Sequence, residues 1–216
     1  MTYIQTKKET ADQIANLLLK IEAIKLNTEK PFTWSSGWKS PIYCDNRLSL
    51  SYPEVRKKIT EGLCQIIRDQ YPQVESIAGV ATAGIAQGAL IAAALDKPFL
   101  YVRPKPKGHG MENLIEGKIT KKQKVVVVED LVSTGGSSLK ATEALLEAGF
   151  AVLGMVSIFN YGFETAEQNF ANANIKLTCL SDYSHMINFA LNNGTIDETK
   201  AASLKAWRVD PANWKQ

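Results

Sequence analysis

Short apolar runs alternate along this chain with longer stretches in which apolar residues have helical spacing. The apolar runs predict strands at 76–80, 99–103, 125–129, 151–159 and 175–180. The helical stretches lie at 8–25, 54–70, 84–95, 137–148, 163–171, 184–193 and 195–206. Strands that alternate with helices indicate an α/β fold, in which helices flank a central parallel sheet with right-handed crossovers.

Two stretches depart from this alternation. Residues 27–50 are rich in turn-forming and aromatic residues, which predicts short strands and loops outside the main sheet. Residues 104–118 combine proline, glycine, lysine and histidine without periodicity, which predicts a mobile loop. The chain has no internal repeat and no low-complexity tract, and its 216 residues suit one α/β domain with a sizeable core.

Candidate chemistry is densest after the strand at 125–129. Four valines lead into two adjacent carboxylates, Glu129 and Asp130, and a small polar loop then opens a helix. The acids can accept hydrogen bonds from vicinal hydroxyls, and the loop amides and the helix dipole can hold a phosphate. Gly135 and Gly136 let the backbone approach phosphate oxygens. Hydroxyl donors are available from Ser133, Thr134, Ser137 and Ser138. The pattern predicts a sugar-phosphate site, and the alternative is an incidental polar turn.

A second strand–loop–helix junction spans residues 79–88. Its small residues, Ala81, Thr82, Ala83 and Gly84, would again let backbone amides approach an anion. Ligands of open α/β sheets bind at the carboxyl ends of the strands, so both loops should converge there. The alternative is that these small residues only allow a helix to pack tightly on the sheet.

Two further segments carry candidate ligand-binding side chains. Arg103, Lys105, Lys107 and His109 lie in the loop between prolines and glycines, and their charges suit a polyanion such as pyrophosphate, unless the loop is simply a solvated basic segment. Residues 32–47 include side chains suited to a flat heterocycle with a carboxylate. Trp34, Trp38 and Tyr43 could stack on the ring and Arg47 could pair with the carboxylate. The alternative is that the aromatic residues form a small hydrophobic core.

Composition narrows the function classes. The 25 basic and 22 acidic residues give a net charge of +3, which does not indicate nucleic-acid binding. Three widely spaced cysteines fit neither a metal site nor a disulfide framework and suit a reducing cytoplasm. The sequence has no run of membrane-spanning length, no signal-peptide pattern, no Walker A motif and no Gly-x-Gly-x-x-Gly. We expect a cytoplasmic protein that binds neither membrane nor nucleic acid.

Four motifs in this order, over about residues 11–180, resemble the type I phosphoribosyltransferases. The segments 103–110 and 36–43 resemble the catalytic loop and the base-binding region of orotate phosphoribosyltransferases in particular. The resemblance implies one domain over residues 1–216, with a core at about 54–190 and a hood built mainly from residues 1–50 and the C-terminal segment. A non-proline cis or otherwise strained peptide near Ala81–Thr82 would fit the resemblance.

The resemblance implies transfer of phosphoribose from phosphoribosyl pyrophosphate (PRPP) to orotate, in pyrimidine synthesis. PRPP would contact Arg103, Lys107, His109, Glu129, Asp130, Leu131, Val132, Ser133, Thr134, Gly135, Gly136 and Ser137, and pyrophosphate would contact Ala81, Thr82, Ala83 and Gly84. Orotate would contact Ser133, Arg47, Tyr43 and Lys39, and the catalytic groups would be Lys107, His109 and Asp130. Mg²⁺ would accompany PRPP with few direct protein ligands, and loop 103–117 would act on the partner subunit of a homodimer.

This chain departs from the family pattern at three places. Family members often carry lysines where it has Ser35 and Ala83, and an arginine where it has the stretch 157–161. The orotate carboxylate would therefore fall to Arg47 or to backbone amides near 36–39. A transferase for another base and a non-catalytic PRPP sensor remain alternatives.

Overall fold

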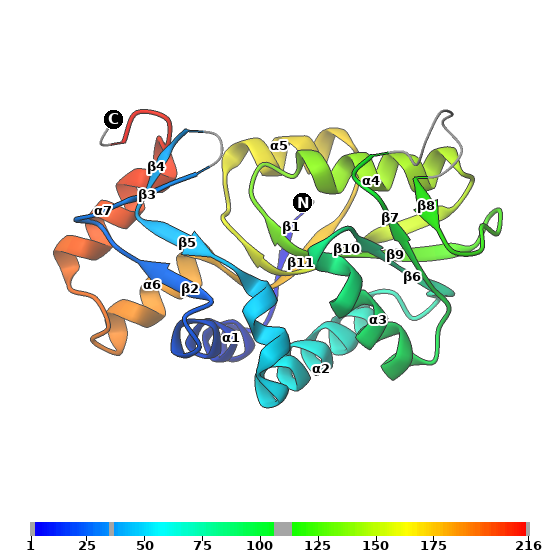
Figure 1. The fold of residues 1–216 in the computed structure, drawn as a ribbon, viewed down its shortest axis with the longest axis horizontal. Helices are drawn as coiled ribbons and strands as arrows, with labels where there is room; N and C mark the ends of the chain where they lie inside the picture. The colour runs from blue at the N-terminus through cyan, green and yellow to red at the C-terminus, as the bar shows by residue number, and fades with distance from the viewer. Residues whose placement is uncertain (1–2, 35–36, 106–113, 215–216) are drawn as a thin grey trace.

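A computed structural model describes residues 3–34, 37–105 and 114–214. Its central layer is a seven-stranded sheet with the order β1-β11-β10-β9-β6-β7-β8 (Figure 1). The strands are β1 (Tyr3–Gln5), β6 (Ser76–Val80), β7 (Phe99–Val102), β8 (Ile115–Glu116), β9 (Lys124–Val132), β10 (Ala151–Asn160) and β11 (Leu177–Asp182). All neighbouring strands pair in parallel except β8, which pairs antiparallel with β7 at one edge.

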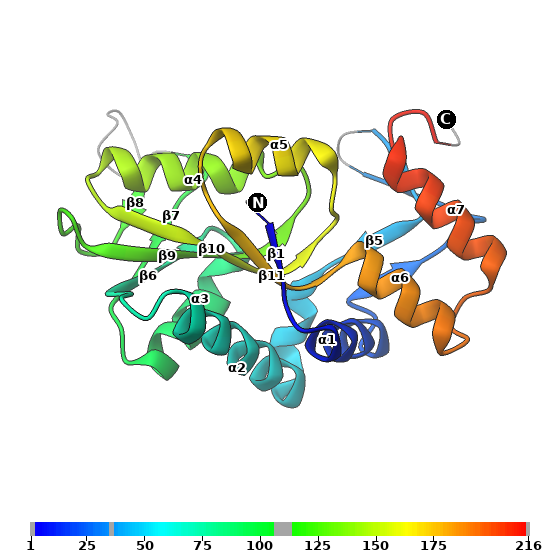
Figure 2. The ribbon, with the colours of Figure 1, turned by 180° about the vertical axis from the view of Figure 1, so that it is seen from behind.

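Helices cover both faces of this sheet, as the alternating pattern predicts. One face carries α1 (Lys8–Lys20), α2 (Pro53–Gln70) and α3 (Ala83–Leu95), and the other carries α4 (Gly136–Glu147) and α5 (Glu164–Asn172) (Figures 1 and 2). The valines of β9 divide between the two cores: Val126 and Val128 face the first group of helices, and Val125 and Val127 face the second. Burial on both faces explains why this strand is continuously apolar.

A smaller unit, the hood, lies at one end of the sheet (Figure 1). It contains β2 (Ile24–Leu26), β3 (Phe32–Thr33), β4 (Lys39–Ser40), β5 (Ile42–Cys44), the 3₁₀ helix η1 (Asn46–Ser51), α6 (Tyr183–Asn192) and α7 (Glu198–Val209). Trp207 of α7 is fully buried and donates a hydrogen bond from Nε1 to the Lys39 carbonyl (3.0 Å). The C-terminal helix therefore completes a unit that begins near residue 24.

The predicted elements differ from the structure mainly at their ends. The first helix stops at Lys20 rather than residue 25, because Glu22 adopts a left-handed conformation (φ 57°) and Ile24 enters β2. The segment 104–118 contains β8, and the edge strand β1 was not predicted. The strand predicted at 125–129 continues to Val132, because β10 pairs with it that far.

Candidate active site

The site forms where β6 ends before its neighbour β9, which continues for several residues. The last pair between β6 and β9 is Gly79 with Val128, whereas β9 remains paired with β10 as far as Val132. Glu129 and Asp130 therefore stand within a strand, not at its tip, and one edge of that strand is open. A cavity of about 320 Å³ fills the opening. It is lined by Cys44, Asp45, Arg47, Val80, Ala81, Thr82, Ala83, Glu129, Asp130, Leu131 and Ser137.

The two acids occupy different environments. Glu129 is only 5% exposed; it accepts hydrogen bonds from Ser138 Oγ at Oε2 (2.9 Å) and from the Asp130 N–H at Oε1 (3.0 Å). Burial, and then the neighbouring Asp130 charge, raise the pKa of Glu129 well above its usual range. Burial also raises the pKa of Asp130, against the opposing effects of hydrogen bonds and of Arg47. Two carboxyls this close resist full ionisation.

The loop after β9 has the geometry of an anion site. Gly135 has φ 80°, and a Cβ there would lie 2.6 Å from Phe170 Cε2, so a side chain is excluded for two reasons. The helix α4 begins directly afterwards at Gly136, and its first-turn amides have no partners within the helix. Thr134 is fixed from outside the loop, because its carbonyl accepts a hydrogen bond from Asn169 Nδ2 (2.9 Å).

The predicted phosphate-loop residues do not all face the opening. Leu131 and Ser137 line the cavity, and Val132 is buried. Ser133 is half-buried and Thr134 is exposed. Ser138, predicted as a phosphate donor, is instead buried against Glu129, because its position in the first turn of α4 points it at the strand.

The loop after β6 faces the acids across the cavity. The Ala81–Thr82 peptide bond is cis, as expected. Ala81, Thr82 and Ala83 line the cavity. A Cβ on Gly79 would lie 2.7 Å from the Gly84 carbonyl oxygen, and one on Gly84 would lie 2.5 Å from that of Val128. The packing interpretation therefore holds for the two glycines, while the four residues between them, 80–83, line the cavity.

A second cavity of about 660 Å³ adjoins the first. The two share Val80, Ala81 and Ser137, and Arg103 and Lys140 supply positive charge to the second. Arg103 Nη1 also forms an ion pair with Glu116 Oε1 (3.1 Å), which joins the strands on either side of the predicted catalytic loop. Lys107 and His109 lie outside the described residues.

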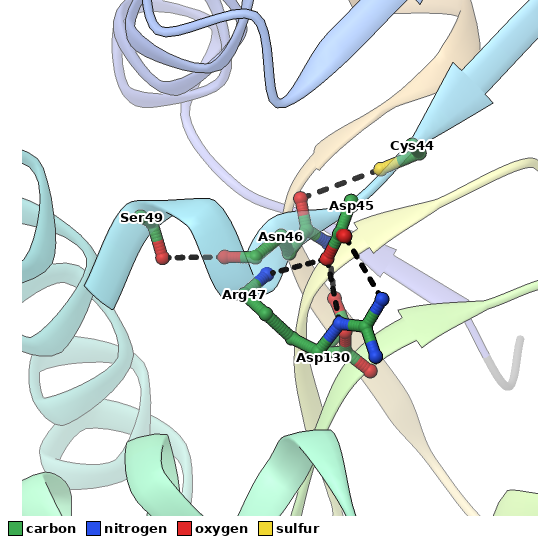
Figure 3. A network of polar contacts seen from close by, with 6 residues as sticks. All are labelled: Cys44, Asp45, Asn46, Arg47, Ser49 and Asp130. Atoms are coloured by element: carbon green, nitrogen blue, oxygen red, sulfur yellow. Dashed lines mark hydrogen bonds and ion pairs between the residues drawn. The ribbon is translucent and has the colours of Figure 1, made fainter. Parts of the chain in front are cut away.

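The hood contributes the opposite wall of the first cavity. Arg47 binds Asp45 in a bidentate manner, with Nε–Oδ1 at 2.7 Å and Nη2–Oδ2 at 2.8 Å, close to Asp130 (Figure 3). Its side chain remains 62% exposed. Two of the other predicted base-binding residues lie elsewhere on the hood: Tyr43 packs against Phe32 with ring centroids 5.7 Å apart, and Lys39 Nζ bonds Thr33 Oγ1 (3.2 Å). The third, Ser133, lies in the loop after β9.

The tryptophans predicted to stack on a heterocycle have other neighbours. Trp34 packs among Tyr161 and Trp207, with ring centroids 5.0 and 5.4 Å away, and so belongs to the hood core. Trp38 lines a separate cavity that it shares with Thr134. The hydrophobic-core interpretation therefore holds for Trp34.

Sequence reasoning missed Cys44, Asp45 and Asn46 as neighbours of the acid pair. Asn46 is buried, and its side-chain Nδ2 donates to the Asp130 carbonyl (2.7 Å) (Figure 3). The polar Asp-Asn-Arg run after a short strand was the available signal. Its position opposite a strand 84 residues away was not readable from the local pattern.

No group of three or more histidine, cysteine, aspartate and glutamate side chains in the described ranges could hold a metal ion. None of the helices in those ranges is both long and apolar enough to span a bilayer.

Comparisons with known proteins agree with this geometry. The model of the phosphoribosyl transferase domain matches residues 50–185. An orotate phosphoribosyltransferase of Cytophaga hutchinsonii is 60% identical over 204 residues, which cover 94% of this chain and 98% of that relative.

Solved structures give the same result for the fold. The crystal structure of orotate phosphoribosyltransferase from Aeropyrum pernix superposes with a TM-score of 0.74 at 29% identity, over 85% of this chain and 99% of that one. The Mycobacterium tuberculosis enzyme in complex with PRPP has a TM-score of 0.64 at 22% identity, over 82% and 98%, and shows the fold alone. The domain match and the near-full-length identity together show that this chain belongs to the orotate phosphoribosyltransferases of the phosphoribosyltransferase family.

Proposed function

We propose that the protein transfers the 5-phosphoribosyl group of PRPP to orotate, giving orotidine 5′-phosphate and pyrophosphate in the de novo synthesis of UMP. One observation carries this proposal: the acid pair on β9 faces the 81–84 loop across a single cavity, beside the start of α4. The acids suit the ribose hydroxyls, the 81–84 loop suits a pyrophosphate, and the start of α4 suits the 5-phosphate.

Each part of PRPP has a matching wall. Glu129 and Asp130 accept hydrogen bonds from the ribose hydroxyls, and the amides of residues 133–137 with the α4 dipole hold the 5-phosphate. The pyrophosphate lies along residues 81–84 and toward Arg103, whose guanidinium lines the adjoining cavity. Because Ala81 and Ser137 line both cavities, one substrate can extend from one into the other.

The reaction exchanges two bonds at C1 of the ribose. The bond from C1 to the pyrophosphate oxygen breaks, the bond from C1 to the orotate ring nitrogen forms, and that nitrogen loses its proton. Positive charge develops on the sugar, so catalysis depends on orientation and on stabilising the departing anion. Asp130 orients the ribose or accepts the proton, and Lys107 and His109 stabilise the departing pyrophosphate.

Orotate enters from the hood side. Arg47 is our candidate for its carboxylate, with Ser133, Tyr43 and Lys39 as further contacts. Arg47 lies on the cavity wall, and most of its side chain is exposed although Asp45 holds it. Binding orotate would require the guanidinium to exchange Asp45 for the ligand or to use its remaining N–H groups. Backbone amides near 36–39 are the alternative partner.

Mg²⁺ is part of the proposal as a companion of PRPP. It prefers oxygen ligands, keeps several waters and needs only one or two carboxylates, and Glu129 and Asp130 are available at the cavity. The described residues offer no larger acidic group, so most of its ligands would come from PRPP and water. When bound, it neutralises part of the pyrophosphate charge.

We further propose a cytoplasmic homodimer in which loop 103–117 acts on the partner subunit. Tyr43 and Leu48 of the hood, and Tyr52 directly after η1, are substantially exposed, as expected for a surface that a second copy covers. Cys44, Cys64 and Cys179 are thiols in the described chain, which suits a reducing compartment. Mixing an Asp130→Asn variant with a Lys107→Ala variant tests the loop: restored activity supports action in trans, and none opposes it.

The decisive experiment follows orotate absorbance over time with purified protein, PRPP and Mg²⁺. A decrease that requires all three components establishes the reaction and the base. Turnover only with another base would replace the substrate and keep the sugar chemistry. PRPP binding without turnover of any base would make the protein a sensor and overturn the proposal.

A further inference from the structure

The open edge of β9 leaves a backbone carbonyl that no strand reaches. The Glu75 N–H donates to the Lys124 carbonyl (2.9 Å), so the even-numbered carbonyls of β9 from 124 to 130 point toward β6, whereas that of Val132 accepts from the Tyr161 N–H (3.0 Å). The last pair along this edge is Gly79 with Val128. The next carbonyl on the same edge belongs to Asp130. At that level the chain has left the strand, because β6 ends at Val80 and α3 begins at Ala83.

A side chain of the hood takes the position that the missing strand would fill. Asn46 Nδ2 donates to the Asp130 carbonyl at 2.7 Å, and Asn46 Oδ1 accepts a hydrogen bond from Cys44 Sγ at 3.4 Å (Figure 3). Asn46 is 1% exposed. An amide with partners at both ends and no access to water has one favourable orientation.

The turn that carries Asn46 is fixed as well. Ser49 Oγ donates to the Asn46 carbonyl (2.6 Å), and Asp45 accepts the Arg47 N–H (3.2 Å) as well as its guanidinium. Cys44, Asp45 and Arg47, the neighbours of Asn46 in sequence, all line the cavity. One buried amide therefore joins the wall that faces the base to the strand that faces the ribose.

We propose that Asn46 is a positioning residue for the phosphoribosyl transfer. It holds the Asp130 backbone in place, and thereby holds the Asp130 carboxyl where the ribose binds. This inference rests on the proposed function. Asn46 does not itself line the cavity among the described residues, so it acts through Asp130 and through the hood turn. The hydrogen bonds of its side chain go to Cys44 and Asp130, not to residues 81–84 or 133–137. Its loss should therefore affect the chemical step more than the binding of PRPP.

The test compares Asn46→Leu, which keeps the size and removes the donor, with Ser181→Ala. Ser181 is a matched control, because its buried hydroxyl also donates to a distant backbone carbonyl, that of Ala11 (2.9 Å), between β11 and α1. We expect kcat of Asn46→Leu to fall about 10- to 100-fold, while KM for PRPP changes by less than about threefold. Ser181→Ala should keep both constants once activity is scaled to the folded fraction.

A second variant and a second measurement keep the proposal falsifiable. Ser49→Ala removes the bond that shapes the turn and should lower kcat less than Asn46→Leu, and it serves if the latter does not fold. Hydrogen exchange at residues 129–133 should be faster in either Asn46 or Ser49 variants and unchanged in Ser181→Ala. Unaltered kcat and unaltered exchange would overturn the positioning role. An inactive wild type would instead contradict the proposed function. Hydrogen exchange at residues 129–133 alone would then decide whether Asn46 holds this part of β9 in place.

Discussion

The two walls of the cavity are built by different means. On the sheet side, β9, α3 and α4 place the acids and the loop amides through backbone pairing and close backbone contacts, such as Gly84 against the Val128 carbonyl. On the hood side, side chains do this work: Asn46 reaches Asp130, Asp45 holds Arg47, and Trp207 holds Lys39. In the proposed assignment, the backbone-built wall holds the sugar phosphate and the side-chain-built wall holds the base.

The largest effect should come from removing the centre of the hood. Trp207→Ala deletes a fully buried ring that contacts Trp34, Tyr161 and Tyr183. We expect the free energy of unfolding to fall by about 3–5 kcal/mol, measured by chemical denaturation. Trp214→Ala, at a partly buried edge of the same core, should cost clearly less. Equal losses would contradict the placement of Trp207 at the centre of this core and Trp214 at its edge.

On the sheet side, Asp130→Asn should lower kcat about 10²- to 10³-fold without unfolding the protein, because it removes a charge at the reacting sugar. The steady-state rate with PRPP and orotate measures this. Asp69→Asn, an exposed carboxylate in α2, is the control and should have wild-type activity. A comparable rate for Asp130→Asn would remove that carboxyl from the mechanism.

Adjacent glycines give a matched pair within the phosphate loop. Gly135→Ala would force a Cβ into Phe170 at a positive φ, whereas a Cβ at Gly136 meets nothing closer than Thr134 Oγ1 at 3.9 Å. We expect the first to destabilise the free protein by about 2–3 kcal/mol and the second by less than about 1. Thermal melts without ligand measure both. Two equal melting temperatures would contradict the geometry of the loop.

For the hood side, Arg47→Gln should raise KM for orotate about tenfold and leave KM for PRPP nearly unchanged, because one charge-assisted pair is lost. Initial rates at varied orotate measure this. Arg68→Gln, exposed on α2, is the control. If KM for PRPP rises instead, Arg47 contacts PRPP and not orotate.

The smallest effect concerns pH. Because the pKa of Glu129 is raised on folding, its contribution to stability is fully present below its unfolded pKa of about 4.3 and is lost as pH rises through the folded value. Glu129→Gln, which stays neutral, should therefore be more stable than wild type at neutral pH and lose the advantage near pH 4. Each unit of pKa difference corresponds to about 1.4 kcal/mol. Denaturation at both pH values checks the sign, and a constant difference would contradict it.

Local patterns predicted the sheet-side wall well because its chemistry is consecutive in sequence. The run from Val125 to Ser137 contains strand, acids, loop and helix start, and the structure keeps them in that order. The pattern could not predict how far β9 extends. It continues four residues, 129 to 132, beyond its last pair with β6, and only the pairing with β10 decides this. The same limit misplaced Ser138, whose direction depends on where α4 begins.

Prediction was weaker on the hood. The sequence identified residues 27–50 as irregular and aromatic, and named Arg47 as a candidate. It did not reveal that Asp45 already binds Arg47, or that Trp34 packs on the C-terminal helix rather than facing the cavity. The second outcome depends on segments more than a hundred residues apart, because α7 returns to cover the N-terminal strands. The first is a local contact between residues two positions apart, which the sequence pattern did not single out.

The sequence by itself determined the order of strands and helices, the acid pair, the small-residue loops and the family to which they belong, because each rests on neighbouring residues with fixed local geometry. The tertiary structure decided which edge of β9 is open, which hydroxyl the buried Glu129 engages, and which amide completes that edge. Those results depend on where one strand ends beside another and on a contact between residues 46 and 130. Short-range spacing contains no information about either.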